Sequence, residues 1–286
     1  MKKFLIIVLS GLLIQSCDSS KKRNADQQSM EESHETTQVQ QSVALEEWEN
    51  PKRFISMQGS ANFRDLGGYT TSNGKQIKWQ KLYRSDKLSK LTTQDVDAMV
   101  DLGIKTVVDL RTEKEKQRDP SVLPEGVNVV EIPIWREEWN YFLELTAQQV
   151  DSLERARVNT AQGSEPRIVD SYIAFPDEFQ PEVARFFETL AQEENYPILF
   201  HCSAGTDRTG FLAALTLSYL EVPEDVIVED YALSKKLRLK SEEKDTRIVY
   251  TLEKLKKYGG AESYLTSVNG GNTEQLNRVQ EILLND

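Results

Sequence analysis

Residues 197–211 read Pro-Ile-Leu-Phe-His-Cys-Ser-Ala-Gly-Thr-Asp-Arg-Thr-Gly-Phe, and this stretch determines the fold that the sequence predicts. Residues 198–200 are a short apolar run, which is typical of a buried strand. Residues 211–220 are apolar nearly all round and predict a buried helix. A loop that leads from a strand end to a helix N-terminus points several backbone N–H groups inward. Such a loop forms a binding site for anions.

Cys202 and Arg208 lie in this loop with five residues between them. A thiol beneath an anion site ionises readily, because the thiolate is the anion that the site favours. An arginine across the loop presents a planar fork that suits two phosphate oxygens. A nucleophile and a phosphate site in one loop therefore indicate transfer of a phosphoryl group to sulfur. The alternative is a buried, unreactive cysteine in a core loop.

The loop resembles the signature of the cysteine-based protein tyrosine and dual-specificity phosphatases. The resemblance implies an α/β protein with the cysteine-phosphatase fold, in which helices flank a central, largely parallel sheet of four to five strands. It implies that Cys202 is the nucleophile, that Arg208 binds phosphate, and that no cofactor takes part. The residues that carry the resemblance are His201, Cys202, Ala204, Gly205, Arg208, Thr209 and Gly210. The implied phosphate-binding residues are Ser203, Ala204, Gly205, Thr206, Asp207 and Arg208, supported by His201 and Thr209.

A second motif, Asn-Phe-Arg-Asp-Leu-Gly-Gly-Tyr at residues 62–69, is similar to the opening motif of one bacterial and fungal branch of these phosphatases. Bacterial members of that branch include secreted tyrosine and lipid phosphatases. Arg64 is therefore a candidate supporting residue, which lines the pocket or pins the N-terminal segment to the domain. Thr206 departs from the branch, since many members carry a lysine there that suits highly phosphorylated substrates. The absence of this lysine favours phosphotyrosine or a general phosphomonoester, rather than a phosphorylated lipid, as the substrate.

The remaining pattern agrees with a sheet that is at least partly parallel. A helix over residues 92–102, ended by Gly103, lies between predicted strands at 76–84 and 104–111. Further patterns predict a strand at 127–134 and a helix at 179–193. Strand–helix–strand units of this kind build parallel sheets with their ligand sites at the carboxyl edge.

A leaving alkoxide or phenoxide needs a proton as its P–O bond breaks, and a positioned carboxylic acid supplies it. Asp109 ends the strand at 104–111, and the resemblance makes it the preferred general acid. Its alternative role is to cap a loop or to pair with Arg111. Asp207, inside the loop, and Asp170, upstream of it, are the rival acids. The segment 136–160 is charged, with aromatic residues at its start, and fits either a lid over the pocket or a surface helix.

The N-terminus predicts export. Residues 1–16 combine two lysines with an apolar run that is too short to span a bilayer, which identifies a signal peptide. Cys17 follows it and resembles the lipidated cysteine of bacterial lipoproteins; the alternative is an ordinary secretory signal. Residues 17–50 are polar and predict a flexible tether, and residues 51–286 form one phosphatase domain. We therefore expect a lipid-anchored protein of a bacterial cell envelope, in the periplasm or at the cell surface.

Composition narrows the function further. The chain carries a formal net charge of −11, and −13 once the two signal-peptide lysines are removed, which argues against nucleic acid as a partner. It has two cysteines, so a lipidated Cys17 leaves Cys202 as a free thiol. With only two histidines, no metal site is expected. The prediction is a phosphomonoester hydrolase with a phosphocysteine intermediate, acting on phosphotyrosine or with dual specificity. The alternatives are a phosphoinositide or inositol polyphosphate phosphatase and an inactive phosphate-binding module.

Overall fold

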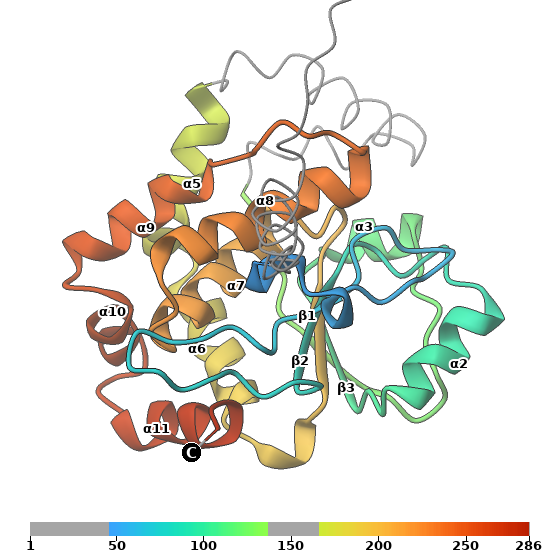
Figure 1. Ribbon diagram of the computed structural model, residues 1–286, viewed down its shortest axis with the longest axis horizontal. Coiled ribbons are helices and arrows are strands. Elements are labelled where there is room, and N and C mark those ends of the chain that lie inside the picture. The colour runs from blue at the N-terminus through green and yellow to red at the C-terminus, as the bar shows by residue number, and fades with distance from the viewer. Residues whose placement is uncertain (1–45, 137–165, 286) are drawn as a thin grey trace, which may run out of the picture. The chain divides into compact units, whose positions relative to one another are not determined.

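The computed structural model describes residues 46–136 and 166–285, apart from the side chains of residues 166–171. Its strands form a five-stranded sheet in the order β1-β2-β5-β3-β4 (Figure 1). β1 runs antiparallel to β2, and the other neighbouring pairs are parallel. The predicted α/β fold with a largely parallel sheet is therefore confirmed. The strands are β1 Arg64–Asp65, β2 Leu82–Ser85, β3 Thr106–Asp109, β4 Asn128–Glu131 and β5 Ile198–His201.

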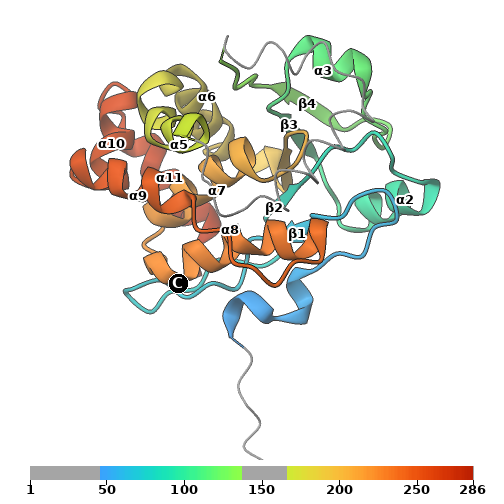
Figure 2. The same cartoon turned by 90° about the horizontal axis from the view of Figure 1, so that it is seen from above.

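Helices lie on both sides of the sheet (Figure 2). α2 lies on one side, and α6, α7, α10 and α11 lie on the other, as both views show (Figures 1 and 2). The α-helices are α2 Thr93–Asp101, α3 Glu113–Arg118, α5 Pro166–Glu178, α6 Gln180–Leu190, α7 Asp207–Tyr219, α8 Glu224–Leu239, α9 Ile248–Lys257, α10 Ala261–Val268 and α11 Thr273–Leu283. Short 3-10 helices are η1 Glu47–Glu49, η2 Pro51–Arg53 and η4 Glu193–Asn195.

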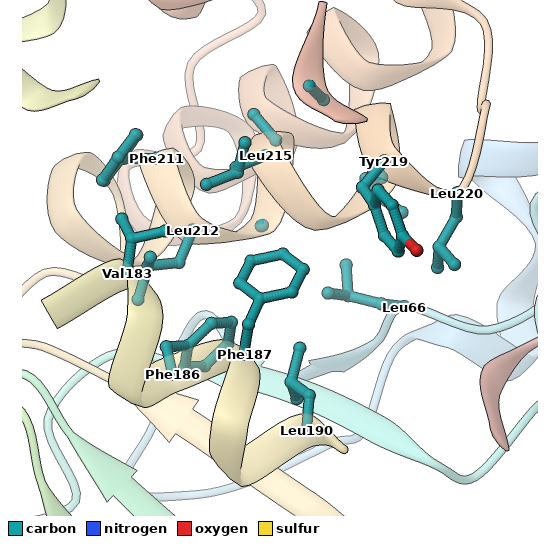
Figure 3. Packing of buried hydrophobic residues seen from close by; sticks show 14 of the residues in the cluster. Leu66, Val183, Phe186, Phe187, Leu190, Phe211, Leu212, Leu215, Tyr219 and Leu220 are labelled. Atoms are coloured by element: carbon teal, nitrogen blue, oxygen red, sulfur yellow. The ribbon is translucent and has the colours of Figure 1, made fainter. Parts of the chain in front are cut away.

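Successive side chains along each strand point to opposite faces of the sheet, so the hydrophobic core is divided between the two faces. Tyr83, Leu199 and Val107 are neighbours across three strands and pack with the residues of α2. Phe200 and Val108, one residue further along, belong to the larger cluster on the opposite face. There the aromatic residues of α6 meet the leucines of α7 (Figure 3). Each such buried side chain stabilises the fold by about 1.5–3 kcal/mol, so both faces hold β5 in the centre of the domain.

The observed strands and helices are mostly shorter than the sequence predicts, and two of the differences bear on the site. The strand expected over residues 76–84 is reduced to β2, because the chain turns at Gln80, which has a φ of 60°. The N–H of Gln80 donates to the Asp65 carboxylate at 2.7 Å and fixes that turn. The helix expected from residue 211 begins earlier, at Asp207, so that the end of the anion loop is already helical. The apolar pattern does not reveal this first turn, because its residues are polar or glycine.

The last residues of the predicted tether, 46–50, contact the domain. The fully buried Arg53 guanidinium donates to the carbonyls of Asp65, at 2.8 Å, and Glu47, at 3.1 Å. The Glu47 carboxylate accepts a hydrogen bond from the backbone N–H of Thr70 at 2.9 Å. Arg53 therefore joins the first described turn to the strand that carries the motif at residues 62–69.

Several sequence predictions lie outside the described residues. These are the signal peptide at 1–16, Cys17, most of the tether, and the proposed lid, apart from residue 136. Within residues 46–136 and 166–285, none of the helices combines the length and the apolar character needed to cross a bilayer.

Candidate active site

The anion loop lies at the carboxyl edge of the sheet, directly after the central strand β5. Ser85, His201 and Asp109 end three adjacent strands in register, and Cys202 follows His201. The Cys202 side chain is 1% exposed, and the N–H of Gly205 donates to its sulfur at 3.2 Å. Gly205 has a φ of 66°, a conformation that favours glycine. The chain thereby wraps around the thiol and places a backbone donor against it.

Carbonyl groups on the back of the loop are bound by neighbouring segments. The backbone N–H of Lys87 donates to the Ser203 carbonyl at 3.1 Å. The Asn62 amide donates to the carbonyls of Ala204 and Gly205 at 3.2 and 3.1 Å, and the Arg84 guanidinium donates to the latter at 2.7 Å. Because a trans peptide points its C=O and N–H in opposite directions, these contacts turn the N–H groups of the loop away from its back. The loop is thus preformed for an anion.

Arg208 is held by the carboxylate of Glu115, a residue that is not among the predicted site residues. Its two terminal nitrogens donate to the two Glu115 oxygens at 2.9 and 2.8 Å, and the Ser203 hydroxyl donates to the same carboxylate at 2.7 Å. Burial raises the pKa of Glu115, but the charge of Arg208 and these hydrogen bonds outweigh it and lower this pKa to about 2. The Arg208 guanidinium also lies 5.5 Å from the centre of the Trp135 ring. The phosphate-binding side chain is therefore oriented before a ligand arrives.

Asp109, the preferred general acid, lies in an environment that holds it ionised. Its side chain is buried and accepts hydrogen bonds from Arg111, of which the shortest is 2.7 Å. Burial raises the pKa of Asp109, but His201 and Arg111 outweigh this effect and lower it below its ordinary value. A carboxylate fixed in this way is a poor proton donor. The geometry instead matches the alternative role of Asp109, pairing with Arg111.

Asp207 lies at the first turn of α7, and its side chain is 43% exposed. The Tyr172 hydroxyl donates to its carboxylate, and the Arg247 guanidinium lies 3.6 Å away. Of the acids weighed from the sequence, Asp207 is placed in the loop itself and reaches solvent. Asp170 lies in α5, and its side chain is outside the described residues.

His201 and Thr209 support the loop from beneath. His201 Nδ1 lies 3.2 Å from the Cys202 carbonyl oxygen, and its Nε2 lies 3.5 Å from the Asp109 carboxylate. Burial lowers the pKa of His201, although Asp109 opposes this shift. The Thr209 hydroxyl is fully buried and has no hydrogen-bond partner among the described residues. Within the same residues, no cluster of histidine, cysteine or carboxylate side chains is arranged to hold a metal ion.

Arg64 does not face the phosphate site. It is fully buried, its Nε lies 3.1 Å from Asp230, and it also donates to Ser234 at 3.1 Å and to Asn62. Of the two roles considered for Arg64, lining the pocket or pinning the N-terminal segment to the domain, these contacts match the second. Asp230 is 166 residues away in the chain, and a single sequence carries no signal for this pair. For Glu115, the available signal was its place three residues after Thr112, with which it forms a capping box.

An anion loop between the central strand and a buried helix, with a thiol against one of its N–H groups and an oriented arginine, defines the cysteine phosphatase class. Residues 55–285 match the profile described as the tyrosine phosphatase family. The match covers most of the chain, which therefore belongs to that family.

Individual relatives share about 30% sequence identity with this chain over part of its length. A Cupriavidus necator protein classed by name with tyrosine-protein phosphatases is 30% identical over 171 residues, 60% of this chain and 59% of that one. A tyrosine-protein phosphatase of Nostoc commune is 29% identical over 53% of this chain and 47% of its own. The triple specificity protein phosphatase PtpB of Mycobacterium tuberculosis is 29% identical over 62% of this chain and 67% of its own. The chain thus spans about half to two thirds of the length of these curated relatives.

The solved structures that the chain matches have lower sequence identities to it. The catalytic core of the PP-IP phosphatase Siw14 from S. cerevisiae, in complex with citrate, shares 14% identity at a TM-score of 0.37, covering 76% of this chain and 98% of its own. TpbA of P. aeruginosa in complex with pTyr shares 16% identity at a TM-score of 0.34, covering 81% and 98%.

Proposed function

We propose that this protein hydrolyses phosphomonoesters through a phosphocysteine intermediate on Cys202, and that phosphotyrosine in proteins is its substrate class. The observation that carries the proposal is the arrangement of one loop. The loop places the backbone N–H of Gly205 3.2 Å from the buried sulfur of Cys202, and Glu115 already orients its Arg208. Family membership and the names of the curated relatives support phosphotyrosine. Threonine at position 206, in place of lysine, supports it over highly phosphorylated lipids.

The first step is a displacement at phosphorus. The Cys202 thiolate attacks, the S–P bond forms, and the bond from phosphorus to the leaving oxygen breaks. The three equatorial oxygens receive hydrogen bonds from the loop N–H groups and from the donors of Arg208 that Glu115 leaves unused. Holding Arg208 in place beforehand spares the entropy of ordering a long side chain during the reaction.

The leaving oxygen takes its proton from Asp207 in this proposal. Asp207 belongs to the loop, and its side chain is 43% exposed, whereas Asp109 is buried. Asp109 is unsuited, because Arg111 holds it ionised. In the second step Asp207 removes a proton from water, the water oxygen attacks phosphorus, and the S–P bond breaks to regenerate the thiolate. The buried Thr209 hydroxyl, which lacks a partner among the described residues, is the donor we assign to that leaving sulfur.

The test is Cys202→Ser measured with a substrate panel. We expect the variant to lose hydrolysis while it still binds tungstate, since the loop N–H groups and Arg208 remain. Wild-type protein should release phosphate from a phosphotyrosine peptide faster than from a phosphoserine peptide, a phosphoinositide or phytate. Faster release from phosphoinositide or phytate would overturn the assigned substrate class. Hydrolysis by Cys202→Ser would overturn the mechanism, and an inactive wild type would favour a phosphate-binding module.

We further propose that the protein is a lipoprotein of a bacterial cell envelope, anchored through Cys17. The signal-like residues 1–16, followed directly by a cysteine, support this proposal. Lipid chains on Cys17 would hold the domain at a membrane without a spanning helix. In a detergent phase-separation experiment, the wild type should partition into the detergent phase and Cys17→Ser into the aqueous phase. Equal partition of the two proteins would contradict the anchor.

A further inference from the structure

A continuous chain of hydrogen bonds leads from a buried ion pair to the sulfur of Cys202. Arg64 donates to the side-chain oxygen of Asn62, and the Asn62 amide donates to the Ala204 carbonyl at 3.2 Å. The peptide that bears this carbonyl bears the N–H of Gly205 at its other end, and that N–H donates to Cys202 Sγ at 3.2 Å. Asn62 thus contacts the back of the very peptide whose front contacts the thiol.

These hydrogen bonds lie in the interior of the domain, where hydrogen bonds polarise one another more than they do in water. Asn62 and Arg64 are fully buried, and Cys202 is 1% exposed, so water does not screen the contacts. A donor that draws electron density from a peptide oxygen makes the N–H of the same peptide a better donor. The charge of Arg64 acts on Asn62 in the same direction. Asp230 and Ser234 fix the guanidinium of Arg64 from its other side, which keeps the geometry constant.

We propose that Asn62, oriented by Arg64, is a positioning residue that stabilises the thiolate form of Cys202 through the Ala204–Gly205 peptide. The proposal rests on the function proposed above, in which this thiolate is the nucleophile. It gives the motif at residues 62–69 a role in the chemistry of a loop that lies 142 residues further along the chain.

Other charged groups lie on the elements packed around the loop and contribute a background that the Asn62 contact modifies. Arg208 is one of them, since it lies in the same loop as Cys202. The remainder come from the ends of the three central strands, from α3, from α7 and from the loops beside them. They are Asp86 and Lys87 after β2, Asp109 and Arg111 at the end of β3, Glu115 on α3, Asp119 after it, His201 on β5 and Asp207 on α7, with Arg84 and Asp230 behind the loop.

The experiment measures the pH dependence of alkylation of Cys202 by iodoacetamide in the full chain. The rate is read from the peptide that contains Cys202 by mass spectrometry, so that Cys17 does not interfere. In Asn62→Ala we expect the midpoint of this profile to rise by a few tenths of a pH unit, because the neighbouring contact strengthens the Gly205 hydrogen bond to the sulfur by about 10–30%. In Asn62→Asp it should rise further, because the donor is replaced by an oxygen and the added negative charge also disfavours the thiolate. This variant keeps the size of the side chain and provides the answer should Asn62→Ala fail to fold.

The kinetic profile distinguishes this role from damage to the loop. The acid limb of kcat/KM should shift upward by the same amount, and activity should return as the pH is raised. A matched control is Asn195→Ala. The Asn195 amide also donates to a backbone carbonyl, that of Thr189 at 2.9 Å, but it lies in η4, before the start of β5 and at the end of that strand away from the loop. Its midpoint should equal that of the wild type.

An unchanged midpoint in folded Asn62→Asp, with Cys202→Ser inactive, would overturn the proposal and leave the function intact. A loss of activity that no pH restores would likewise overturn it in favour of a structural role. Hydrolysis by Cys202→Ser would instead overturn the proposed function, whatever the midpoints show.

Discussion

The carboxylate of Glu115 forms two parallel hydrogen bonds, of 2.8 and 2.9 Å, with the guanidinium of Arg208. The two residues lie 93 positions apart, and both are largely buried. Paired, planar contacts of this kind are the strongest that arginine makes with a carboxylate. The Ser203 hydroxyl adds a third contact to Glu115, so the carboxylate ties the beginning of the anion loop to its end. Glu115 therefore organises the phosphate site without belonging to the loop.

Replacing Glu115 by glutamine should lower kcat/KM by about 10- to 100-fold, because Arg208 loses the partner that orients it. Steady-state hydrolysis of p-nitrophenyl phosphate measures the effect. Glu113→Gln is the matched control on the same short helix, since Glu113 is 67% exposed and pairs with Lys116. It should leave kcat/KM unchanged. Equal values for the wild type and Glu115→Gln would show that Arg208 needs no orientation.

The stability of the domain should fall in acid partly through Glu115. Its pKa is about 2 in the folded protein against an ordinary 4.5, so its contribution is complete above about pH 4.5. That contribution is lost as the pH falls from there toward about 2, when the carboxylate takes up a proton and releases Arg208. Urea unfolding between about pH 3 and 5 should therefore show a steeper loss of free energy in the wild type than in Glu115→Gln. Parallel slopes would contradict the low pKa.

The sequence predicts the loop well and its surroundings poorly, and the reason is physical. Cys202 and Arg208 belong to one local motif whose strand and helix are visible as apolar runs. Glu115 lies in the run Glu-Lys-Glu-Lys-Gln-Arg, which looks like a solvated helix. Only the arrangement of the strands, with β5 between β2 and β3, brings that helix to the loop. Contacts that depend on strand order are not encoded in local spacing.

The choice of general acid shows the same limit. Asp109 ends its strand as the pattern predicts, and it pairs with Arg111, which is the alternative role of this residue. What favours its pairing with Arg111 over the acid role is the number of hydrogen bonds that this arginine makes to the Asp109 carboxylate. Such detail depends on the rotamer of a long side chain, which the spacing of residues does not determine.

Asp207→Asn and Asp109→Asn should differ in how they respond to the leaving group. We expect Asp207→Asn to lower kcat for a phosphotyrosine peptide by about 10²- to 10³-fold, because a poor leaving oxygen needs the proton. With a fluorinated aryl phosphate, whose leaving group needs no proton, the loss should be much smaller. Asp109→Asn should affect both substrates equally. The reverse pattern would restore Asp109 as the acid.

Asp230→Asn should destabilise the domain by about 3–5 kcal/mol, because it leaves Arg64 and Arg84 buried without their carboxylate. Asp230 is 1% exposed and lies 3.1 Å from Arg64 and 2.7 Å from Arg84. Urea unfolding monitored by circular dichroism gives the difference. The neighbouring Glu229→Gln is the control, since its pair with Lys244 is on the surface and should be worth less than about 1 kcal/mol. Similar losses in both variants would argue against the buried cluster as a source of stability.

Gly205 and Gly103 provide a matched pair that separates backbone conformation from close packing. Both have a φ of 66°, so alanine at either position costs about 1–2 kcal/mol for the left-handed conformation alone. At Gly103 an added Cβ meets nothing within 4 Å, whereas at Gly205 it would lie 2.4 Å from the Ser85 carbonyl oxygen. That oxygen belongs to the backbone at the end of β2 and has little freedom to move.

Gly205→Ala should therefore displace the loop from β2 and move the N–H that contacts Cys202. We expect kcat/KM to fall by about 100-fold or more and tungstate to stabilise the variant far less than the wild type in thermal unfolding. Gly103→Ala should lower the melting temperature slightly and leave kcat/KM and the tungstate effect unchanged. If the two variants instead behave alike, the approach of the loop to Ser85 does not control the phosphate site, and the conformation of the glycine alone accounts for its presence.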